Sequence, residues 1–556
     1  MPPILLRFLQ SFSGVGLLLG TLFFAASLAP SLIPRHFVTQ GVLSGLAVAS
    51  GYGIGVALRG LWRWLGLPEA ERRRPVLLLK GAAALVCAGI AWYFLWHSSE
   101  WQNSIRQLMQ MPPVESARPF AVAAIALSVF LIFVLVARAF LWAFGLFARY
   151  LERHVPARLS MLVALVLVSA LFWTIGNGVL VQGVVNAMDA SYARLDQLIE
   201  DDIAPPTDPL KTGSPASLLD WEALGRQGRA AVARGPGQAE IAAFTGRPAR
   251  EPLRVYVGAR SAPTVEERAR LALDELIRVG GFDRAALVIA TPTGTGWLDP
   301  AGQQPLEYLL QGDVATVAVQ YSYLPSWLSI LVDPDIGEET ARAVFRLIYD
   351  HWRGLPRDSR PKLYLNGLSL GSLNSDLSFN MFQILGDPVD GIFWVGPPFQ
   401  NRTWAELTAG RNPGTPPWLP QVGDGSVVRF TSQTNHLHDQ GAAWGPVRMV
   451  ILQYASDPMT FADPAYAYRR PDWLSDPRGP DVSPKVAWYP VITFLQLLVD
   501  MMTAVTPPMG FGHVYAPEHY IDGWVEVARP AGWTPEEIAR LKARLGAELR
   551  GVEKNP

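Results

Sequence analysis

The sequence has little cysteine and almost no net charge. Cys87 is the only cysteine among 556 residues, so no disulfide forms within the chain, and its apolar surroundings are typical of a buried structural thiol. The formal net charge is −1, which gives no support for nucleic-acid binding through bulk electrostatics. No repeat or low-complexity tract is present. The chain is too long for a single core, so two or three domains are expected.

Charged residues are scarce over the first 180 positions, where apolar runs dominate. Five runs are long enough to cross a bilayer, each needing about 20 residues. They are approximately 11–33, 41–61, 76–97, 119–146 and 158–182. Little positive charge precedes the first run and four more follow, which favours a retained helix over a signal peptide. We therefore predict an all-α transmembrane bundle of about five helices over residues 1–182.

Basic residues predict the orientation of this bundle. They concentrate in the second-to-third loop, with Arg59, Arg63, Arg72, Arg73, Arg74 and Lys80, and in the fourth-to-fifth loop, with Arg149, Arg153 and Arg158. The positive-inside rule places both loops and the N-terminus in the cytoplasm. Five crossings of the cytoplasmic (inner) membrane then put the rest of the chain on the extracytoplasmic, or periplasmic, side. We expect the bundle to anchor the protein in the lipid bilayer; a transporter or scaffold with a vestigial enzyme domain is the alternative.

The remainder of the chain reads as a linker followed by an α/β domain. Residues 183–250 contain two amphipathic stretches separated by a segment rich in proline and glycine. From residue 251 to 556, strands alternate with helices, and the strands are apolar runs rich in β-branched residues. The strand segments are 253–257, 286–290, 314–319, 362–365, 391–395 and 447–452. This pattern indicates a mostly parallel sheet covered on both faces.

A candidate nucleophile follows one of these strands. The segment Gly367-Leu368-Ser369-Leu370-Gly371 fits G-x-S-x-G, in which a strained strand-to-helix turn exposes the serine hydroxyl. A serine of this kind needs a base to take its proton and an acid to orient the base. In α/β-hydrolases, the acid and then the histidine follow the serine along the chain.

The chain offers two candidates for each partner. Asp457 lies just beyond a buried strand and is favoured as the acid, with Asp463 as the alternative. His513 is flanked by glycines in Gly510-Phe-Gly-His-Val-Tyr515 and is favoured as the base, while His519 sits at an expected helix start. The predicted triad is therefore Ser369, Asp457 and His513.

An acyl-transfer site also needs donors for the developing oxyanion. We expect one from the backbone N–H of Leu370 and another from the glycine-rich loop 291–297, at Gly294 and Thr295. A phosphate-binding loop is not expected there, because the segment lacks the Gly-Lys-Ser/Thr ending of a P-loop. The pair His436 and His438 belongs to a solvated loop rather than a metal site, for want of a second ligand cluster. The sequence indicates no metal, no cofactor and no particular oligomeric state.

Several segments together resemble the bacterial membrane-bound α/β-hydrolases that carry a multi-helix N-terminal domain. The resemblance spans nearly the whole chain and rests on residues 291–300, 320–327, 369–372, 394–398, 456–458, 471–474 and 512–515. It implies the same triad, Ser369, Asp457 and His513. Family members commonly carry Glu at the position of Leu368 and His at that of Phe511, so this chain departs from the pattern at two places close to the site.

These observations predict a membrane-anchored serine hydrolase. The expected reaction is cleavage of an acyl ester, through an acyl-enzyme intermediate, in a lipid or an acylated envelope component such as a glycan. Acyl transfer to a sugar or lipid hydroxyl is the alternative within the same chemistry, because one triad serves both reactions. Peptide cleavage uses the same nucleophile, but no feature of the sequence points to a peptide cleft.

Overall fold

The computed structural model describes the whole chain except residues 1–10, 69–72, 201, 476 and 554–556. It divides into two compact units. The helical unit comprises Met1–Gly183 together with Ala462–Pro508, and the sheet unit comprises Val184–Phe461 together with Met509–Pro556. Each unit is therefore built from two separate stretches of chain. Residues 462–508, here called the insert, fold with the N-terminal helices, although no pattern in the sequence indicates it.

The first stretch of the helical unit is a series of apolar helices. They are α2 (Gly14–Ser27), α3 (Phe37–Trp64), α4 (Arg73–Leu108), α5 (Pro119–Leu151), α6 (Ala157–Trp173) and the π-helical run η1 (Thr174–Val181). The run continues into α7 (Gln182–Gln197), which passes into the sheet unit. Four of the described helices are long and apolar enough to cross a membrane: Phe37–Trp64, Gly81–Leu108, Pro119–Leu151 and Ala157–Gln197.

The first of the five predicted spans, 11–33, does not form a membrane-length helix in the described residues. α2 has 14 residues, which at 1.5 Å each extend roughly 21 Å, less than the ~30 Å of a bilayer core. The apolar run continues past Ser27, but Pro30 and Pro34 cannot extend the helix, since proline lacks an N–H donor. Hydropathy therefore overstated the length of this element.

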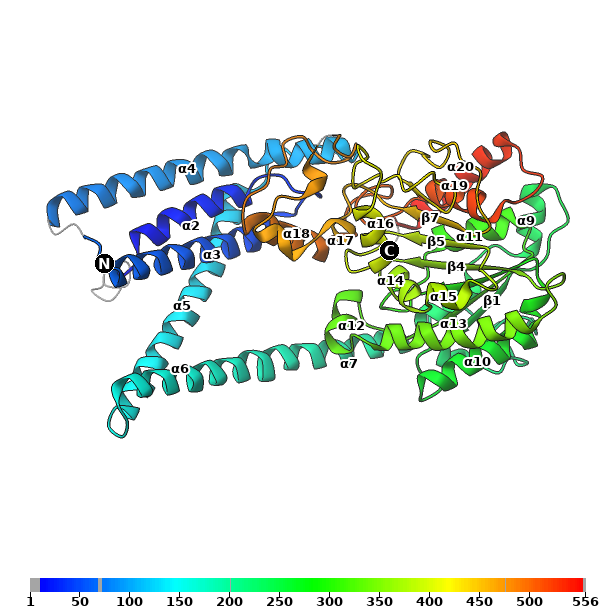
Figure 1. Cartoon of the computed structure of the whole chain (residues 1–556), viewed down its shortest axis with the longest axis horizontal. Coiled ribbons are helices and arrows are strands. Elements are labelled where there is room, and N and C mark those ends of the chain that lie inside the picture. Colours follow the sequence, from blue (N-terminus) through cyan, green and yellow to red (C-terminus); the bar gives the residue numbers. More distant parts are fainter. Residues whose placement is uncertain (1–10, 69–72, 201, 476, 554–556) are drawn as a thin grey trace. The chain divides into compact units, whose positions relative to one another are not determined.

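Small residues let α2 and α3 pack closely. A Cβ atom added to Gly55 would lie 2.6 Å from the Cα atom of Gly16, and one added to Gly51 would lie 2.7 Å from the carbonyl oxygen of Leu19. Glycine at these positions allows the two backbones to approach, as small residues do in membrane helix pairs. Figure 1 shows the two helices side by side.

The insert consists mostly of short elements. It contains η4 (Pro464–Ala467), η5 (Asp472–Leu474) and the apolar helix α18 (Ile492–Met502). α18 packs against α2 and α3. The insert is thus part of the helical unit, although it lies near the C-terminus in sequence.

The sheet unit is built on seven strands in the order β1-β3-β2-β4-β5-β7-β6. The strands are β1 (Leu253–Val257), β2 (Ala286–Thr291), β3 (Val314–Val319), β4 (Lys362–Leu368), β5 (Gly391–Val395), β6 (Val428–Thr431) and β7 (Arg448–Leu452). All pairings between these strands are parallel. The predicted mostly parallel sheet is confirmed. All strand carboxyl ends therefore meet at one edge, where ligand sites of such sheets lie.

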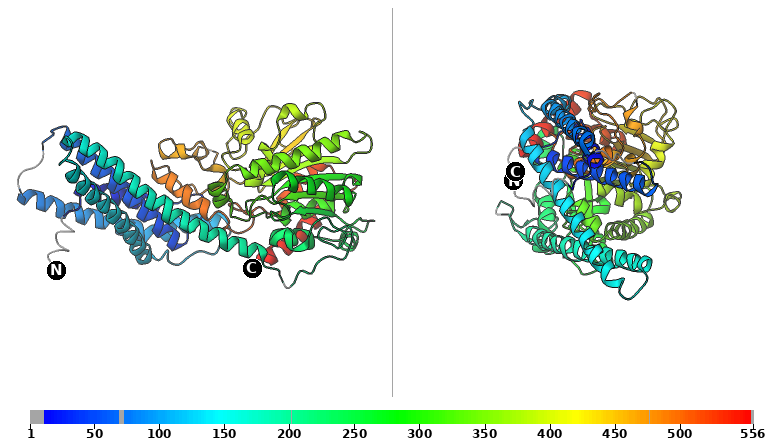
Figure 2. Two further views of the ribbon diagram at one scale, coloured as in Figure 1. Left: turned by 90° about the horizontal axis from the view of Figure 1, so that it is seen from below. Right: turned by 90° about the vertical axis from the view of Figure 1, so that its left-hand side faces the viewer.

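Helices cover both faces of the sheet. α10 (Val265–Arg278) and α13 (Ile336–Gly354) lie on one face, and α11 (Pro300–Leu309), α19 (Pro517–Ala528) and α20 (Pro535–Glu553) lie on the other. From below, Figure 2 shows the green helices in front of the strands and the red ones behind them. Between α19 and the strands, a core forms around Phe393, Tyr520 and Trp524. Burial on both faces explains why the strands are continuous apolar runs.

Shorter elements complete the sheet unit. They are η2 (Trp221–Leu224), α8 (Gly225–Ala233), α9 (Gln238–Thr245), η3 (Gly281–Asp283), α12 (Ser326–Val332), α14 (Leu370–Leu377), α15 (Met381–Ile384), α16 (Arg402–Ala409) and α17 (Pro458–Phe461). Of these, α14 and α17 follow directly on β4 and on the turn after β7, at the carboxyl edge of the sheet.

Candidate active site

Ser369 forms the sharp turn between β4 and α14. Its φ of 55° and ψ of −125° are strained for a residue with a side chain, and its N–H donates to the carbonyl of Val395 at 2.9 Å. The two motif glycines are required by packing. A Cβ atom at Gly367 would lie 2.5 Å from the carbonyl carbon of Gly371, and one at Gly371 would lie 2.2 Å from the carbonyl oxygen of Thr291. The turn thus has the geometry of a nucleophile elbow.

Asp457 lies in the turn between β7 and α17 and is fully buried. Its oxygen Oδ2 accepts from His513 Nδ1 at 2.7 Å, from the Tyr515 hydroxyl at 2.7 Å and from Thr460 Oγ1 at 3.3 Å. Its other oxygen, Oδ1, accepts from the backbone N–H of Met459 at 2.8 Å. These donors compensate the burial of the carboxylate. The alternative acid, Asp463, instead caps η4 by accepting from Ala465 N at 2.8 Å.

His513 projects from the loop between α18 and α19. Gly510 and Gly512 before it have φ values of 99° and 59°, which glycine adopts without strain, and Gly512 N donates to Ser456 Oγ at 2.9 Å. A carboxylate only accepts hydrogen bonds, so His513 Nδ1 donates to Asp457 and Nε2 is left as a base. Nε2 is buried and has no hydrogen-bond partner.

The end of β5 brings the serine and the histidine to the same place. Ser369 N bonds to Val395 O, and a Cβ atom on the next residue, Gly396, would lie 2.9 Å from Cε1 of His513. The hydrogen bond between Ser369 and His513 is not formed in this structure, since Nε2 has no partner. Such bonds are often long without substrate and tighten in the Michaelis complex. The structure therefore gathers the three predicted residues at one edge of the sheet.

The alternative histidine, His519, occupies a different environment. It lies on α19, and its Nδ1 pairs with the Tyr454 hydroxyl at 2.5 Å. Burial lowers the pKa of His519 to about 4, which keeps the ring neutral at physiological pH. Its partner is thus a tyrosine rather than the carboxylate of Asp457.

The loop with His436 and His438 shows no metal-binding geometry. His436 Nδ1 pairs with Asp439 at 2.8 Å, and His438 Nε2 lies 3.3 Å from a Glu526 oxygen. Among the described residues, no group of three or more metal-ligating side chains is present. These histidines make local surface pairs instead.

The predicted oxyanion donors lie on two neighbouring segments. Leu370 is the first residue of α14, where an N–H has no acceptor inside the helix. Gly294 N donates to Ser326 Oγ at 3.3 Å, and the carbonyl of Thr295 accepts from Gln320 Nε2 at 3.2 Å. The start of this loop touches the first turn of α14, as the closeness of Gly371 to Thr291 shows. Donation by Gly294 and Thr295 to a substrate stays a prediction.

Sequence reasoning missed Tyr515 as a site residue. Its hydroxyl donates to the same carboxylate oxygen that accepts from His513. Burial, together with the charge of Asp457, raises the pKa of Tyr515 well above its ordinary range, so it stays a donor. Its place at the end of the segment 512–515, which carries the family resemblance, was the available signal.

Two family models match the chain. One, described as the alpha/beta-hydrolase family, matches residues 253–541, and the other, described as the N-terminus of that family, matches residues 28–236. No curated protein and no solved structure matches the chain. The match over 253–541 covers the sheet, the serine turn and the loops of Asp457 and His513, and the match over 28–236 covers the apolar helices. The chain therefore belongs to the alpha/beta-hydrolase family, of the kind that carries this N-terminal domain.

Proposed function

We propose that this protein is a membrane-anchored serine hydrolase that cleaves an acyl ester through a Ser369–His513–Asp457 triad. One observation carries the proposal. The buried carboxylate of Asp457 accepts from His513 Nδ1 at 2.7 Å, and Nε2 of the same ring has no hydrogen-bond partner. The strained turn of Ser369 is hydrogen-bonded to Val395, at the end of the same strand that His513 lies against. A base oriented by an acid beside an elbow serine is the arrangement that activates a hydroxyl for attack.

Each residue has one task in the proposed reaction. Ser369 Oγ attacks the ester carbonyl carbon while His513 Nε2 takes its proton, and Asp457 stabilises the imidazolium that forms. The N–H of Leu370 and an amide of the Gly294–Thr295 segment bind the oxyanion. The tetrahedral intermediate then expels the alcohol, which receives the proton from His513. Water, activated by the same base, hydrolyses the acyl-enzyme and releases the acid.

The apolar helices support a lipid or an acylated envelope component as substrate. Four helices of the chain are long and apolar enough to span a bilayer, and the last continues into the sheet unit. A hydrolase tied to a bilayer meets its substrate there at high effective concentration. Transfer of the acyl group to a sugar or lipid hydroxyl uses the same intermediate and differs only in the acceptor.

A fluorophosphonate probe tests the nucleophile. We expect it to label the wild-type protein in isolated membranes, and we expect Ser369→Ala to abolish labelling and to lower ester hydrolysis on the order of 10⁶-fold. Ser359→Ala, in an exposed loop, is the control and should label normally. Equal labelling of wild type and Ser369→Ala would refute the proposal.

The substrate and the acceptor need two further measurements. Comparing the lipids and acylated glycans of a Ser369→Ala strain with its parent should show one accumulating class. Adding acceptor alcohols to the ester assay separates the two reactions, because a transferase forms a new ester whereas a hydrolase forms only free acid. A strain that keeps its function with Ser369→Ala would instead favour a scaffold or transporter role.

A further inference from the structure

The insert interrupts the chain between the two partners of the proposed nucleophile. Ala462 follows Asp457 by five residues, and Pro508 precedes His513 by five residues. The 47 residues between them fold with the N-terminal helices rather than with the sheet. The loops that carry the acid and the base therefore flank the two ends of the insert, which itself folds as part of the helical unit.

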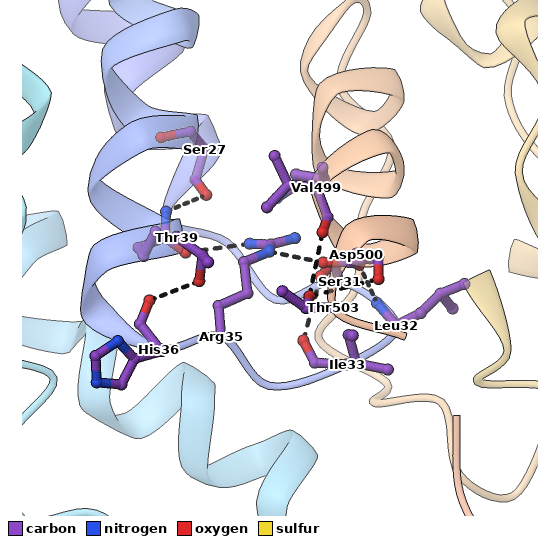
Figure 3. A network of polar contacts seen from close by, with 12 residues as sticks. Ser27, Ser31, Leu32, Ile33, Arg35, His36, Thr39, Val499, Asp500 and Thr503 are labelled. Carbon is purple, nitrogen blue, oxygen red and sulfur yellow. Dashed lines mark hydrogen bonds and ion pairs between the residues drawn. The ribbon is translucent and has the colours of Figure 1, made fainter. Parts of the chain in front are cut away.

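A fully buried ion pair seats the insert in that unit. Arg35 Nε lies 2.8 Å from Asp500 Oδ1, and neither side chain is exposed to solvent. The second carboxylate oxygen of Asp500 accepts from the backbone N–H of Leu32 at 3.3 Å. Figure 3 shows Asp500 on α18 turned toward Arg35 and Leu32, which lie on the segment between α2 and α3.

The same arginine contacts two other helices directly and a third through Gln40. Its Nη1 donates to Gln40 on α3 at 3.1 Å, and its backbone N–H donates to Gln102 on α4 at 2.8 Å. Gln40 in turn donates to the carbonyl of Ser27 on α2 at 3.0 Å. The guanidinium and backbone N–H of Arg35, together with Gln40, thus link α2, α3 and α4 to the insert, so the seating of α18 depends on how those helices are packed.

Additional polar contacts fix the rest of the insert. Gln496 Nε2 donates to the carbonyl of Ala29 at 3.0 Å, the hydroxyls of Ser104 and Ser483 lie 2.9 Å apart, and Lys485 pairs with Glu100. Apolar packing alone is a cheaper way to hold a helix, because buried charges must be desolvated. A buried charge pair, however, specifies one position of α18 along its neighbours, since only that position brings Asp500 to Arg35.

We infer that the seating of the insert in the helical unit, held by Arg35 and Asp500 as positioning residues, sets through the chain the positions of the loops that carry Asp457 and His513. The inference rests on the proposed serine hydrolase function. The connections are short, and proline stiffens both, at Pro458 on one side and at Pro507 and Pro508 on the other. Met502, the last residue of α18, precedes His513 by 11 residues, so a shift of α18 pulls on the base loop, while the acid loop follows the start of the insert at Ala462. A misplacement of about 1 Å at a catalytic group can cost on the order of 100-fold in rate.

The test measures the rate of fluorophosphonate labelling of Ser369 in the full-length protein in membranes, separating the maximal rate from the probe affinity. Asp500→Asn removes the charge while keeping the shape of the side chain. Glu307→Gln is the matched control, because Glu307 forms a buried ion pair, at 2.6 Å, with Arg254 on the outermost strand β1. Protease resistance of each variant gives the folded fraction that normalises the rate.

A second variant leaves every buried contact in place. Four Gly-Ser residues inserted after Thr506, which is exposed, lengthen only the connection between α18 and the His513 loop. The same insertion after Gly386, in an exposed loop before β5, is its control. This arm decides the question even where Asp500→Asn fails to fold.

We expect Asp500→Asn and the Thr506 insertion to lower the maximal labelling rate per folded molecule at least tenfold, with probe affinity and both controls unchanged. Wild-type rates in the Thr506 insertion, or an equal loss in Glu307→Gln, would overturn the inference while leaving the serine mechanism intact. A wild-type protein that is not labelled at all would overturn the proposed function, and the inference with it.

Discussion

Two donors share one oxygen of Asp457. His513 Nδ1 and the Tyr515 hydroxyl both lie 2.7 Å from Oδ2; Asp457 and Tyr515 are buried, and the side chain of His513 is 8% exposed. Hydrogen bonds to a charged group in such surroundings are strong and directional. The tyrosine therefore helps to fix the carboxylate that in turn fixes the imidazole.

Replacing Tyr515 with phenylalanine tests this positioning role. The substitution removes one charge-assisted hydrogen bond, of about 1.5–3 kcal/mol, while keeping the ring. We expect kcat for a soluble ester to fall about tenfold with little change in KM. The control is Tyr520→Phe, because Tyr520 is also buried and donates to an aspartate, Asp299, at 2.9 Å. An equal loss of kcat in both variants would contradict a specific role for Tyr515.

His519 makes stability depend on pH. Burial lowers its pKa to about 4 from the ordinary 6.5, so the unfolded chain binds more protons than the folded one between these values. Protonation of His519 therefore does not reduce the free energy of unfolding above pH 6.5. As the pH falls from 6.5 toward 4, it reduces the free energy of unfolding by a total of about 3 kcal/mol. The midpoint of thermal unfolding, measured in detergent at pH 7 and pH 4.5, should fall less in His519→Gln than in wild type.

The order of residues along the chain was enough to propose the triad. Ser369, Asp457 and His513 each follow a recognisable pattern: an elbow motif, a strand end and a glycine-flanked loop. Tyr515 and Gly396 carry no such pattern, because their roles come from contacts that only the folded chain creates. Leu368, where the family pattern has Glu, packs against the apolar core of the sheet.

Among the elements, the elbow depends on close contact between three pieces of backbone. The end of β2, the end of β4 and the first turn of α14 meet at Gly367 and Gly371, where side chains have no room. This contact sets the position of the serine relative to the loop that follows β2. The glycines of the motif are thus packing requirements of the site.

Gly371→Ala tests this contact. The new methyl group would lie 2.2 Å from the carbonyl oxygen of Thr291, and backbone atoms on both sides cannot rotate away. We expect a loss of about 1–3 kcal/mol in stability and a large loss of fluorophosphonate labelling. Gly386→Ala, where a methyl group meets open space, should change neither. Normal labelling of Gly371→Ala would show that the loop adapts.

Most strands were predictable from apolar runs, but β6 was not. It has four residues, and Arg429 interrupts the apolar pattern in its second position. The structure explains the arginine, whose guanidinium is buried and donates to the carbonyls of Gly425, Leu437 and Ala442. These carbonyls lie only 4, 8 and 13 residues away, but loop carbonyls carry no side-chain pattern, so the sequence gives no sign that they satisfy a buried charge. The length of α2 was overestimated from the sequence, because the apolar run 11–33 extends beyond the helix, which ends at Ser27.

At the scale of the whole molecule, the shortness of α2 leaves one part of the predicted topology unchanged. In the part of the chain that the structure describes, the basic loop at Arg149, Arg153 and Arg158 is followed by a single candidate span, Ala157–Gln197. If this helix spans the bilayer, as predicted, the loop and the sheet unit lie on opposite sides of the membrane, however many spans precede it. The predicted extracytoplasmic side of the sheet unit therefore rests on this loop. The predicted cytoplasmic N-terminus depends in addition on whether α2 crosses the membrane.

Single-cysteine labelling tests the predicted sides of the membrane. Cys87→Ser removes the only thiol, after which Ser359→Cys reports on the sheet unit and Glu152→Cys on the loop after α5; both positions are exposed. With a membrane-impermeant maleimide on intact cells, we expect Ser359→Cys to react and Glu152→Cys to react only after lysis. The reverse pattern would place the sheet unit in the cytoplasm.

The discontinuous helical unit also has a consequence for biosynthesis. Arg35 is made at the start of translation, whereas its partner Asp500 is made roughly 460 residues later, on the order of half a minute at typical elongation rates. During that time the nascent bundle holds a cation whose counterion does not yet exist. We expect this interval to be when chaperones and quality-control proteases act on the chain, because the N-terminal helices cannot complete their fold until α18 arrives.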